Sequence, residues 1–500
     1  MNPLEHWKSI LAGALGGGLV LALVIGGLSS GTESTEVAET EPEQTEQTEE
    51  ATEEQEEQPE VAIEEEAPAC SLEDIENDPL ILQLQAAVIN PETNELIYDI
   101  GADIPSRTAS VMKLLTAAAA LETLGPNYRV ETRVYADSED PTKIYLVGAG
   151  DVTLSRTSPG QQSIYRDAPK LSSLAFQVNS YVSTMEPPAT EEPEQDPNQP
   201  VAPVTPEPEP EPEPEPFTQE ITEIVLDSSL WGGVDGSGQW EKNWNLEGIT
   251  DGWMSQASAL QVDGDRNRPA QLTSVRSEAP IERAGQWFRE SIGDNAQNAV
   301  LSYGTAPANA VEIASVLSEP IKEWIRIMLL RSDNTVAEAL ARLVAYDVGL
   351  DGSDFESLTS AYKLALRGTG LNTQEIVIED GSGLSAYSTV SPEFVAQLME
   401  LVVEGYPNFE NILNALPVAG ESGSLENRFN TGELENAAGK ILAKTGWIRT
   451  GYTLAGTMTA NDGTELVFAV YNLGDVSIPN RDALDELVYG IYDCGASLGN

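Results

Sequence analysis

Apolar and polar residues alternate with the period of a β-strand near both ends of the chain. Residues 81–90 (ILQLQAAVIN) and 94–100 (NELIYDI) predict two strands with a turn between them at PETN. Towards the C-terminus the same alternation predicts three antiparallel strands, at residues 441–448, 451–460 and 464–473. Three further strands are expected at residues 128–136, 143–151 and 220–227.

Helical spacing of apolar residues separates these strands. The stretch RTASVMKLLTAAAALETLG, Arg107–Gly125, is apolar and rich in alanine and predicts one helix. The other expected helices cover residues 171–182, 319–333, 335–349, 391–405 and 480–494. Strands and helices mixed in this way predict an antiparallel sheet with helices on its faces.

One further apolar stretch, Ile10–Leu28, has 19 residues, close to the roughly 20 that a membrane helix needs. Lys8 precedes it, as expected for the cytoplasmic side of an anchor. A cleaved signal peptide is the alternative, although GLSSGTES is a poor cleavage site. We favour an anchor within residues 1–31, and either interpretation places residues 32–500 outside the cytoplasm.

Two segments have no periodic apolar pattern. Residues 32–69 are rich in Glu, Thr and Gln and predict a disordered acidic tether. Residues 186–216 hold 12 Pro and 10 acidic residues and predict an extended insert in a surface loop. Subtracting the 26 acidic residues of these segments from the net charge of −56 leaves −30. So acidic a chain argues against nucleic acid as a partner.

The scarcity of histidine and cysteine excludes several kinds of site. The single histidine, His6, precedes the apolar stretch, so neither a Ser-His-Asp triad nor a His-based zinc site is expected. We predict no metal and no cofactor. Cys70 and Cys494 flank nearly everything that looks folded, and outside the cytoplasm they could form a disulfide. Two free thiols, or a dimer through one cysteine, are the alternatives.

Ser110 and Lys113 stand three residues apart in the helix predicted over Arg107–Gly125, so their hydroxyl and amine face the same way. A nucleophilic serine needs a base. A lysine can serve when burial or neighbouring charge lowers its pKa. Read alone, the pair could equally be a packed serine and a lysine whose charge reaches solvent.

Ser332, Asp333 and Asn334 lie between two predicted helices. Ser332 and Asn334 are two positions apart, so in an extended loop both side chains point the same way. The hydroxyl could relay a proton and the amide could bind a substrate carbonyl. A helix cap is the alternative, because S-D-N is a good capping sequence.

Lys444, Thr445 and Gly446 interrupt an otherwise apolar strand. The cation and the hydroxyl would hold a substrate carboxylate. Gly446 would let the substrate backbone approach closely. The alternative is a lysine that protects a sheet edge from pairing.

Together the three motifs resemble the active-site set of serine β-lactamases and penicillin-binding proteins. The chain is most similar to the D-alanyl-D-alanine carboxypeptidase/endopeptidase family, low-molecular-mass penicillin-binding proteins with a large insertion between the first two motifs. Accessory stretches also match: GAGDVTL (148–154), EIVLDSSLW (223–231), WMSQASALQVDGDRNRP (253–269) and EDGSGLSAYSTVSP (379–392).

The resemblance implies a role for each motif residue. Ser110 would be acylated, Lys113 would deprotonate it, and Ser332 would pass the proton to the leaving D-alanine. Asn334 would bind the peptide, and Lys444 and Thr445, with Gly446 beside them, its carboxylate. The backbone N–H groups of Ser110 and Trp447 would form the oxyanion hole. Asp151 and Asp380 are interpreted as structuring their loops.

The implied substrate is the peptidoglycan stem peptide, with β-lactam antibiotics as covalent inhibitors. The enzyme would cleave D-Ala-D-Ala, and could cleave D-Ala-meso-diaminopimelate cross-links. A β-lactamase or serine esterase is one alternative, and a non-catalytic wall-associated binding or scaffold protein is another. Trp447 departs from the family, which usually has Thr or Ser there, and puts substrate preference in question.

The resemblance also implies an architecture, a transpeptidase-like α+β/α/β fold in which helices flank an antiparallel sheet. The catalytic domain would consist of residues 70–130 and 313–500. Residues 131–312 would form an inserted, mostly-β accessory region that contains the Pro/Glu insert.

Overall fold

The computed structural model describes residues 70–185, 220–231, 246–352 and 355–499, which all belong to one compact unit. The apolar stretch near the N-terminus, the acidic tether and the Pro/Glu insert lie outside the described residues. Among the helices within these ranges, none combines the length and the apolar character that a membrane crossing requires.

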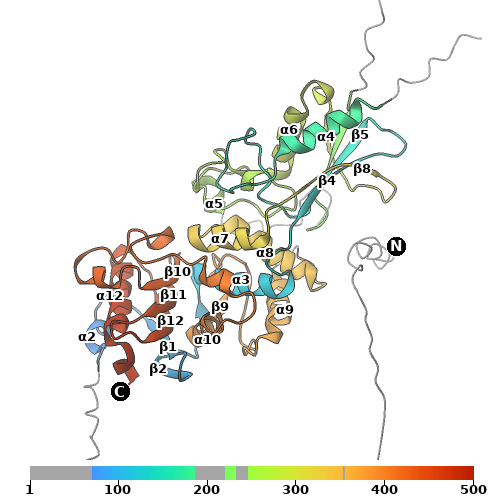
Figure 1. Ribbon diagram of the computed structural model, residues 1–500. Helices are drawn as coiled ribbons and strands as arrows, with labels where there is room; N and C mark the ends of the chain where they lie inside the picture. Colours follow the sequence, from blue (N-terminus) through green and yellow to red (C-terminus); the bar gives the residue numbers. More distant parts are fainter. Residues whose placement is uncertain (1–69, 186–219, 232–245, 353–354, 500) are drawn as a thin grey trace, which may run out of the picture. The chain divides into compact units, whose positions relative to one another are not determined.

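A five-stranded antiparallel sheet joins the strands predicted at the two ends of the chain, in the order β10-β11-β12-β1-β2. Ala87 of β1 stands opposite Ala469 of β12, so the first strand pairs directly with the last. The predicted sheet with helices on its faces is thus confirmed (Figure 1). Its strands are β1 (Leu84–Asn90), β2 (Glu95–Ile100), β10 (Ile441–Ile448), β11 (Gly451–Thr459) and β12 (Glu465–Leu473).

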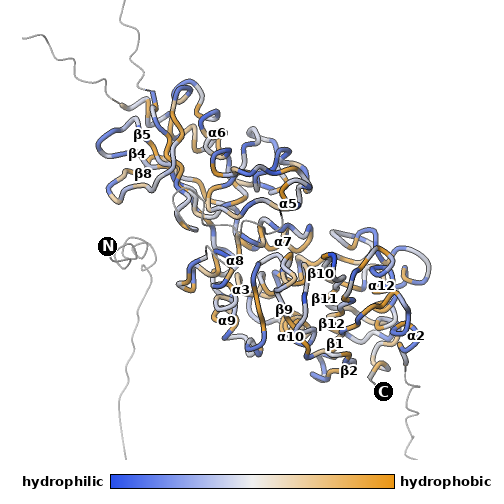
Figure 2. The backbone as a smooth tube through the Cα atoms, turned by 180° about the vertical axis from the view of Figure 1, so that it is seen from behind, coloured by the Kyte–Doolittle hydropathy of each residue, from blue (hydrophilic) through white to orange (hydrophobic). Residues whose placement is uncertain are grey.

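The two faces of this sheet carry different helices because successive side chains of a strand point to opposite sides. In β12, Phe468 and Val470 pack with α12 (Ile478–Cys494). The neighbouring Ala469 and Tyr471 belong to the core cluster on the other face. That face carries α10 (Pro392–Val403), which Figure 2 colours as largely hydrophobic.

A helical layer joins the same core cluster and supports the first two motifs. Its central helix α8 (Asn334–Asp347) is buried continuously from Asn334 to Ala345, so it is apolar on most sides. The layer also contains α3 (Met112–Thr123), α7 (Ile321–Arg331) and α9 (Glu356–Ala365). The short elements are α2 (Glu73–Glu76), α5 (Leu246–Asp251), α11 (Glu410–Leu413), β3 (Ser106–Arg107) and β9 (Thr389–Val390).

The accessory region contains a second five-stranded sheet, in the order β7-β6-β5-β4-β8. β5, β6 and β7 pair in parallel, and β4 and β8 pair antiparallel. The strands are β4 (Glu131–Ala136), β5 (Lys143–Val147), β6 (Glu223–Asp227), β7 (Val300–Tyr303) and β8 (Val311–Leu317).

Helices α4 (Leu171–Val182) and α6 (Pro280–Ile292) complete a separate core cluster with this sheet. The accessory region was predicted to be mostly β, and the structure adds these two helices to its sheet. Parallel strands need crossover connections, and α4 and α6 lie in those crossovers. The residue limits of the two domains stay a prediction.

A disulfide joins Cys70 to Cys494, with the two Cα atoms 5.6 Å apart. The backbone N–H of Cys70 also donates to the carbonyl of Ser497 at 3.2 Å. These contacts fasten the start of the described chain to the end of α12.

Replacing both cysteines by serine is expected to lower the free energy of unfolding by about 2–5 kcal/mol, because the bond closes a very long loop in the unfolded chain. Urea unfolding of the wild type with and without reductant, and of the Cys70→Ser/Cys494→Ser variant, measures the difference. An unchanged urea midpoint in the double variant would contradict this expectation.

Candidate active site

Ser110 lies in a short 3-10 helix, Ala109–Val111, that leads directly into α3. Ala109 adopts a left-handed conformation with φ 45°, which is costly for a residue with a Cβ. Gly383 packs against this turn so closely that a Cβ there would lie 1.8 Å from the Ala109 carbonyl oxygen. The turn is therefore held from outside by a residue that must be glycine.

Lys113 is completely buried one helical turn after Ser110. Its Nζ lies 2.8 Å from Ser110 Oγ. It also donates to Asn334 Oδ1 at 2.7 Å and to the carbonyl of Ser382 at 2.7 Å. With three acceptors the amine has a fixed position, so the lysine is not one that extends to solvent.

The surroundings of Lys113 favour its neutral form. Burial lowers its pKa to about 8, and the nearby carboxylates of Asp380, Glu338 and Asp333 partly oppose this. A lysine with this pKa is neutral in about one-tenth of the molecules at pH 7, compared with roughly 0.03% for an ordinary lysine, and the neutral amine is the form that a general base requires.

The second motif connects α7 to α8. Ser332 ends α7 in a left-handed conformation with φ 57°. Asp333 is the N-cap of α8, and its Oδ1 accepts the backbone N–H of Val336 at 3.0 Å. Capping and chemistry are thus divided within the motif: Asp333 caps the helix, and Ser332 and Asn334 line the cleft.

Lys444 places a second buried amine in the site. Its Nζ donates to Ser332 Oγ at 3.0 Å and to the carbonyl of Thr445 at 2.6 Å. Burial, together with the charges of Lys113 and Arg428, lowers the pKa of Lys444 well below its usual value. The lysine therefore supports the S-D-N loop rather than protecting an exposed sheet edge.

Gly446 allows β10 to lie directly beside the Ser110 turn. A Cβ at this position would lie 2.0 Å from Thr453 Oγ1 and 2.9 Å from the carbonyl oxygen of Thr108. Thr453 Oγ1 in turn donates to that carbonyl at 2.7 Å. Glycine is thus required by packing within the protein, in addition to any approach of a substrate.

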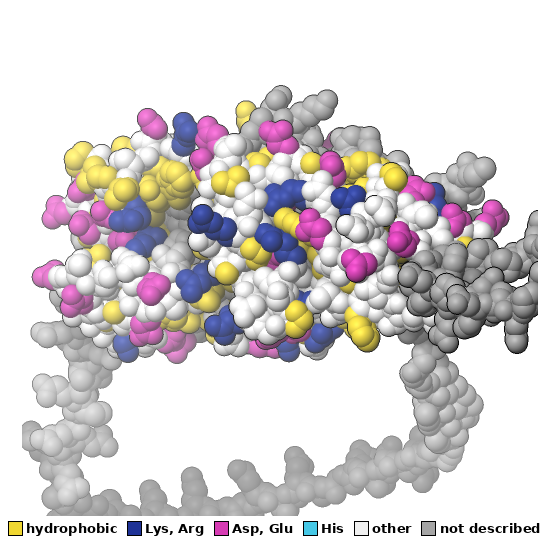
Figure 3. Space-filling model, turned by 90° about the horizontal axis from the view of Figure 1, so that it is seen from above, with side chains coloured by type: hydrophobic (Ala, Val, Ile, Leu, Met, Phe, Trp, Pro, Cys, Tyr) yellow, Lys and Arg dark blue, Asp and Glu magenta, His cyan; other side chains and the backbone are white. Residues whose placement is uncertain are grey.

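These residues surround a cleft of about 1760 Å³. Trp447 is 53% exposed at its wall and lies against Tyr452, with ring centroids 6.3 Å apart. Arg449 pairs with Glu247 of α5 at 3.1 Å. Although the chain is strongly acidic, basic side chains gather on the face of the molecule seen in Figure 3. The cleft itself is lined by Arg428, Arg449 and Arg481 as well as by acidic residues.

All three sequence motifs thus meet in one place, together with residues that the sequence analysis did not single out. Ser382 accepts from Lys113 through its carbonyl, and the Ser424 hydroxyl accepts from Thr445 Oγ1 at 2.7 Å. The Ser382 carbonyl had no side-chain signal to reveal it. Ser424 follows a Gly-rich turn, which gave no chemical signal of its own.

The two aspartates of the accessory motifs structure their loops, as predicted. Asp380 accepts backbone N–H groups from Leu384 and Ser385, and burial raises its pKa to about 6. Asp151 accepts from the backbone N–H and the hydroxyl of Thr153, and burial raises its pKa to about 6 as well.

The fold and these three motifs define an active-site-serine protein of the penicillin-recognising class. Within that class, the chain belongs to the D-Ala-D-Ala carboxypeptidase 3 (S13) family, whose sequence model matches residues 69–180 and 254–488. The resemblance drawn from the motifs is confirmed, and by its family the chain is a serine-type D-Ala-D-Ala carboxypeptidase.

Individual relatives agree with this assignment. Carboxypeptidase DacB of Mycolicibacterium smegmatis is 29% identical over 434 residues, covering 83% of this chain and 84% of that protein. A carboxypeptidase of Mycobacterium tuberculosis is also 29% identical, covering 84% and 82%. The crystal structure of penicillin binding protein 4 (dacB) from Haemophilus influenzae shares the fold, with a TM-score of 0.61 at 18% identity, covering 81% and 96%.

Proposed function

We propose that this protein removes the terminal D-alanine of peptidoglycan stem peptides through an acyl-enzyme on Ser110. The observation that carries the proposal is the 2.8 Å contact between Ser110 Oγ and the buried amine of Lys113. Neutral Lys113 takes the hydroxyl proton while Ser110 Oγ attacks the carbonyl carbon of the penultimate D-alanine. The backbone N–H groups of Ser110 and Trp447 stabilise the oxyanion that forms.

The leaving D-alanine nitrogen needs a proton when its bond to the carbonyl carbon breaks. We assign its delivery to Ser332, whose hydroxyl is hydrogen-bonded to Lys444, gives its proton to the nitrogen and is restored by the proton that Lys113 took from Ser110. Water then attacks the ester on Ser110, which releases the shortened peptide and returns the hydroxyl. Asn334 holds Lys113 through its amide oxygen, and its amide nitrogen, which donates one hydrogen to the carbonyl of Trp253 at 3.2 Å, has a second hydrogen for the peptide.

The terminal carboxylate of the substrate is assigned to Lys444 and Thr445. The low pKa of Lys444 in the unliganded site supports this role, because a bound carboxylate would offset the burial that disfavours the charge. The proposal extends to D-Ala-meso-diaminopimelate cross-links, since the open cleft of about 1760 Å³ leaves room for a branched substrate.

We further propose that the protein acts outside the cytoplasm, held by a membrane helix within residues 10–28. The disulfide supports an oxidising surrounding, and the apolar N-terminal sequence supports the anchor. The same acylation reaction would make β-lactam antibiotics covalent inhibitors. The crystal structure of the Haemophilus influenzae protein has also been obtained with a β-lactam.

The experiment is to incubate the wild type with a pentapeptide that ends in D-Ala-D-Ala and to measure free D-alanine. Release is expected, and prior treatment with penicillin is expected to block it. Mass spectrometry of the penicillin-treated protein should place one adduct on the peptide that contains Ser110. A pentapeptide ending in L-Ala-L-Ala is the control. No release combined with no adduct would refute the proposed function.

A further inference from the structure

The middle residue of the S-D-N motif is turned away from the cleft towards the accessory region. Asp333 has a side chain only 1% exposed, and its Oδ2 accepts from Arg266 Nη2 at 2.6 Å. Arg266 is itself 2% exposed and stands 67 residues earlier in the chain. A buried ion pair therefore connects the accessory region to the loop that carries two proposed site residues.

The guanidinium of Arg266 is fixed on its other sides as well. Its Nη1 donates to the hydroxyl of Tyr165 at 2.6 Å and to the carbonyl of Asp263 at 3.2 Å. Its Nε donates to the carbonyl of Leu272 at 3.4 Å, and its charge lies 5.0 Å from the centre of the Tyr165 ring. Because the guanidinium is planar, these contacts of Nε and Nη1 also fix the position of Nη2, which points at Asp333.

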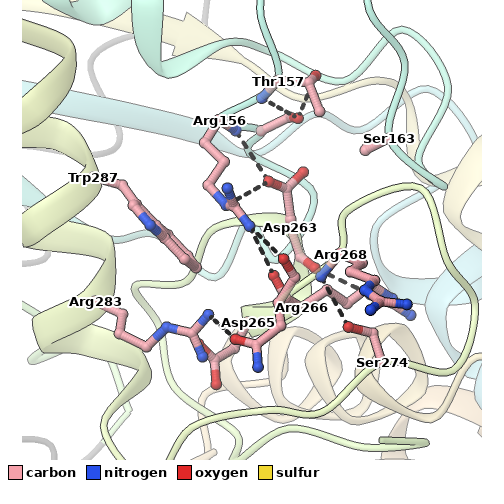
Figure 4. A network of polar contacts seen from close by, with 12 residues as sticks. Arg156, Thr157, Ser163, Asp263, Asp265, Arg266, Arg268, Ser274, Arg283 and Trp287 are labelled. Carbon is pink, nitrogen blue, oxygen red and sulfur yellow. Dashed lines mark hydrogen bonds and ion pairs between the residues drawn. The ribbon is translucent and has the colours of Figure 1, made fainter.

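The turn that precedes Arg266 is unusually constrained. Asp263, Gly264 and Asp265 adopt φ values of 54°, 55° and 57°, a left-handed run that only outside contacts can maintain. Asp263 Oδ2 accepts the backbone N–H of Arg156 at 3.1 Å, and Asp265 pairs with Arg283 at 3.2 Å (Figure 4). This network, centred on the Asp263–Asp265 turn, gives Arg266 a rigid base.

The two residues that flank Asp333 contact the two buried lysines of the site, Lys113 and Lys444. Ser332 contacts Lys444, and Asn334 contacts Lys113. A shift of Asp333 would move both of its neighbours relative to the amines. Misplacing groups by about 1 Å in a catalytic site can cost about 100-fold in rate. The position of Asp333 is therefore a condition for the geometry of the whole motif.

Charge balance gives Arg266 a second reason to be present. Burial alone would raise the pKa of Asp333, but Arg266 and the N–H of Val336 hold it below its usual value. The charge of Asp333 in turn raises the pKa of Lys113 and so partly opposes the effect of burial on that amine. Removing Arg266 would take away the only ion-pair partner that the described residues give this buried carboxylate, and would leave it the hydroxyl of Tyr165 at 3.4 Å and the backbone N–H of Val336 at 3.0 Å.

We propose that Arg266 is a positioning residue through which the accessory region holds the S-D-N loop. It thereby keeps the side chain of Ser332 in contact with Lys444 and that of Asn334 in contact with Lys113. This inference rests on the proposed function, because its effect is read as the rate of acylation at Ser110.

The test compares acylation by a fluorescent penicillin in the wild type and in Arg266→Met. The second-order rate constant is measured per titratable site, so that molecules that fail to fold do not contribute. We expect Arg266→Met to acylate about 100-fold more slowly. Adding Asp333→Asn to Arg266→Met should recover a large part of the rate, because the unpaired buried charge is then gone. A purely structural role predicts that the melting temperature of Arg266→Met falls while its rate per titratable site stays at the wild-type value.

Arg283→Met is the matched control, since Arg283 anchors the same turn through Asp265 but does not contact the loop. Its melting temperature should fall, while its acylation rate should fall far less than that of Arg266→Met. If Arg266→Met does not fold, Arg266→Lys is measured instead and should also be slowed. A wild-type rate in the Arg266 variant overturns the positioning role alone, whereas a wild type that is never acylated overturns the proposed function.

Discussion

Replacing Lys113 by methionine is expected to slow acylation of Ser110 by about 1,000-fold, within the range that a general base contributes. Methionine has a similar length but cannot accept a proton. Lys113 is the only amine for which the described structure shows a hydrogen bond to Ser110 Oγ. Stopped-flow or gel-based labelling with a fluorescent penicillin measures the rate constant, and Ser110→Ala gives the background.

Lys170→Met is the matched control for this variant. Lys170 also bonds to a hydroxyl and a carbonyl, those of Thr157 and Gln161, but in the accessory region. The control should lose some thermal stability and keep the wild-type rate. A Lys113→Met protein that is folded and labelled at an undiminished rate would remove Lys113 from the mechanism.

The same assignment fixes the direction of the pH dependence. The pKa of Lys113 is lowered from 10.5 to about 8, so the neutral, proton-accepting form grows as the pH rises towards 8. The acylation rate should therefore increase up to about pH 8 and then level off, and Lys113→Met should lose this dependence. Stability changes in the same direction. The unfolded chain binds this proton more tightly than the folded protein does, so the cost of burying the Lys113 amine falls, and the free energy of unfolding rises, as the pH rises from about 8 to 10.5.

Gly383→Ala is expected to have the second large effect. The added Cβ would lie 1.8 Å from the Ala109 carbonyl oxygen and 2.8 Å from Met112 Cβ, at a residue with φ 77°. Either the Ser110 turn or the Ser382 carbonyl that holds Lys113 must move. We expect a loss of about 3 kcal/mol in unfolding free energy from strain and overpacking, together with about a 100-fold slower acylation.

Gly405 is the control that separates the cost of a left-handed backbone from the cost of a steric clash. It has φ 80°, and nothing lies within 4 Å of a Cβ built there. Gly405→Ala should therefore show only the cost of the left-handed conformation, about 1–2 kcal/mol, with an unchanged rate. Equal acylation rates in the Gly383 and Gly405 variants would mean that the close contact at Ala109 has no role in the site.

Much of the fold was readable because its elements carry local patterns. The helix at residues 171–182 and the strand at 441–448 have the expected limits, since each has a clean period and clear ends. The helix Pro280–Ile292 was missed although Ile281, Ala284, Phe288 and Ile292 share one face. Polar residues dominate that segment, and its role as a crossover between parallel strands depends on a pairing that no local pattern reveals.

In the site, too, the residues in local motifs could be predicted and their distant partners could not. Ser110, Lys113 and Lys444 stand in short motifs whose residue types already suggest their chemistry. The partners that fix them do not, because the Ser382 carbonyl has no sequence signature and Arg266 meets Asp333 only in the folded chain. An arginine within DGDRNRP looks like one more surface charge until its burial is known.

The Cys70–Cys494 bond also determines how the protein would carry a mechanical load. Tension that enters the chain ahead of Cys70 would pass through the covalent bond into α12, whose buried leucines grip the sheet over many residues. Without the bond the same force would pass through α2 to β1 and pull it from its neighbours β12 and β2. With the bond in place, a load applied ahead of Cys70 bypasses β1 and its pairing with β12 and β2.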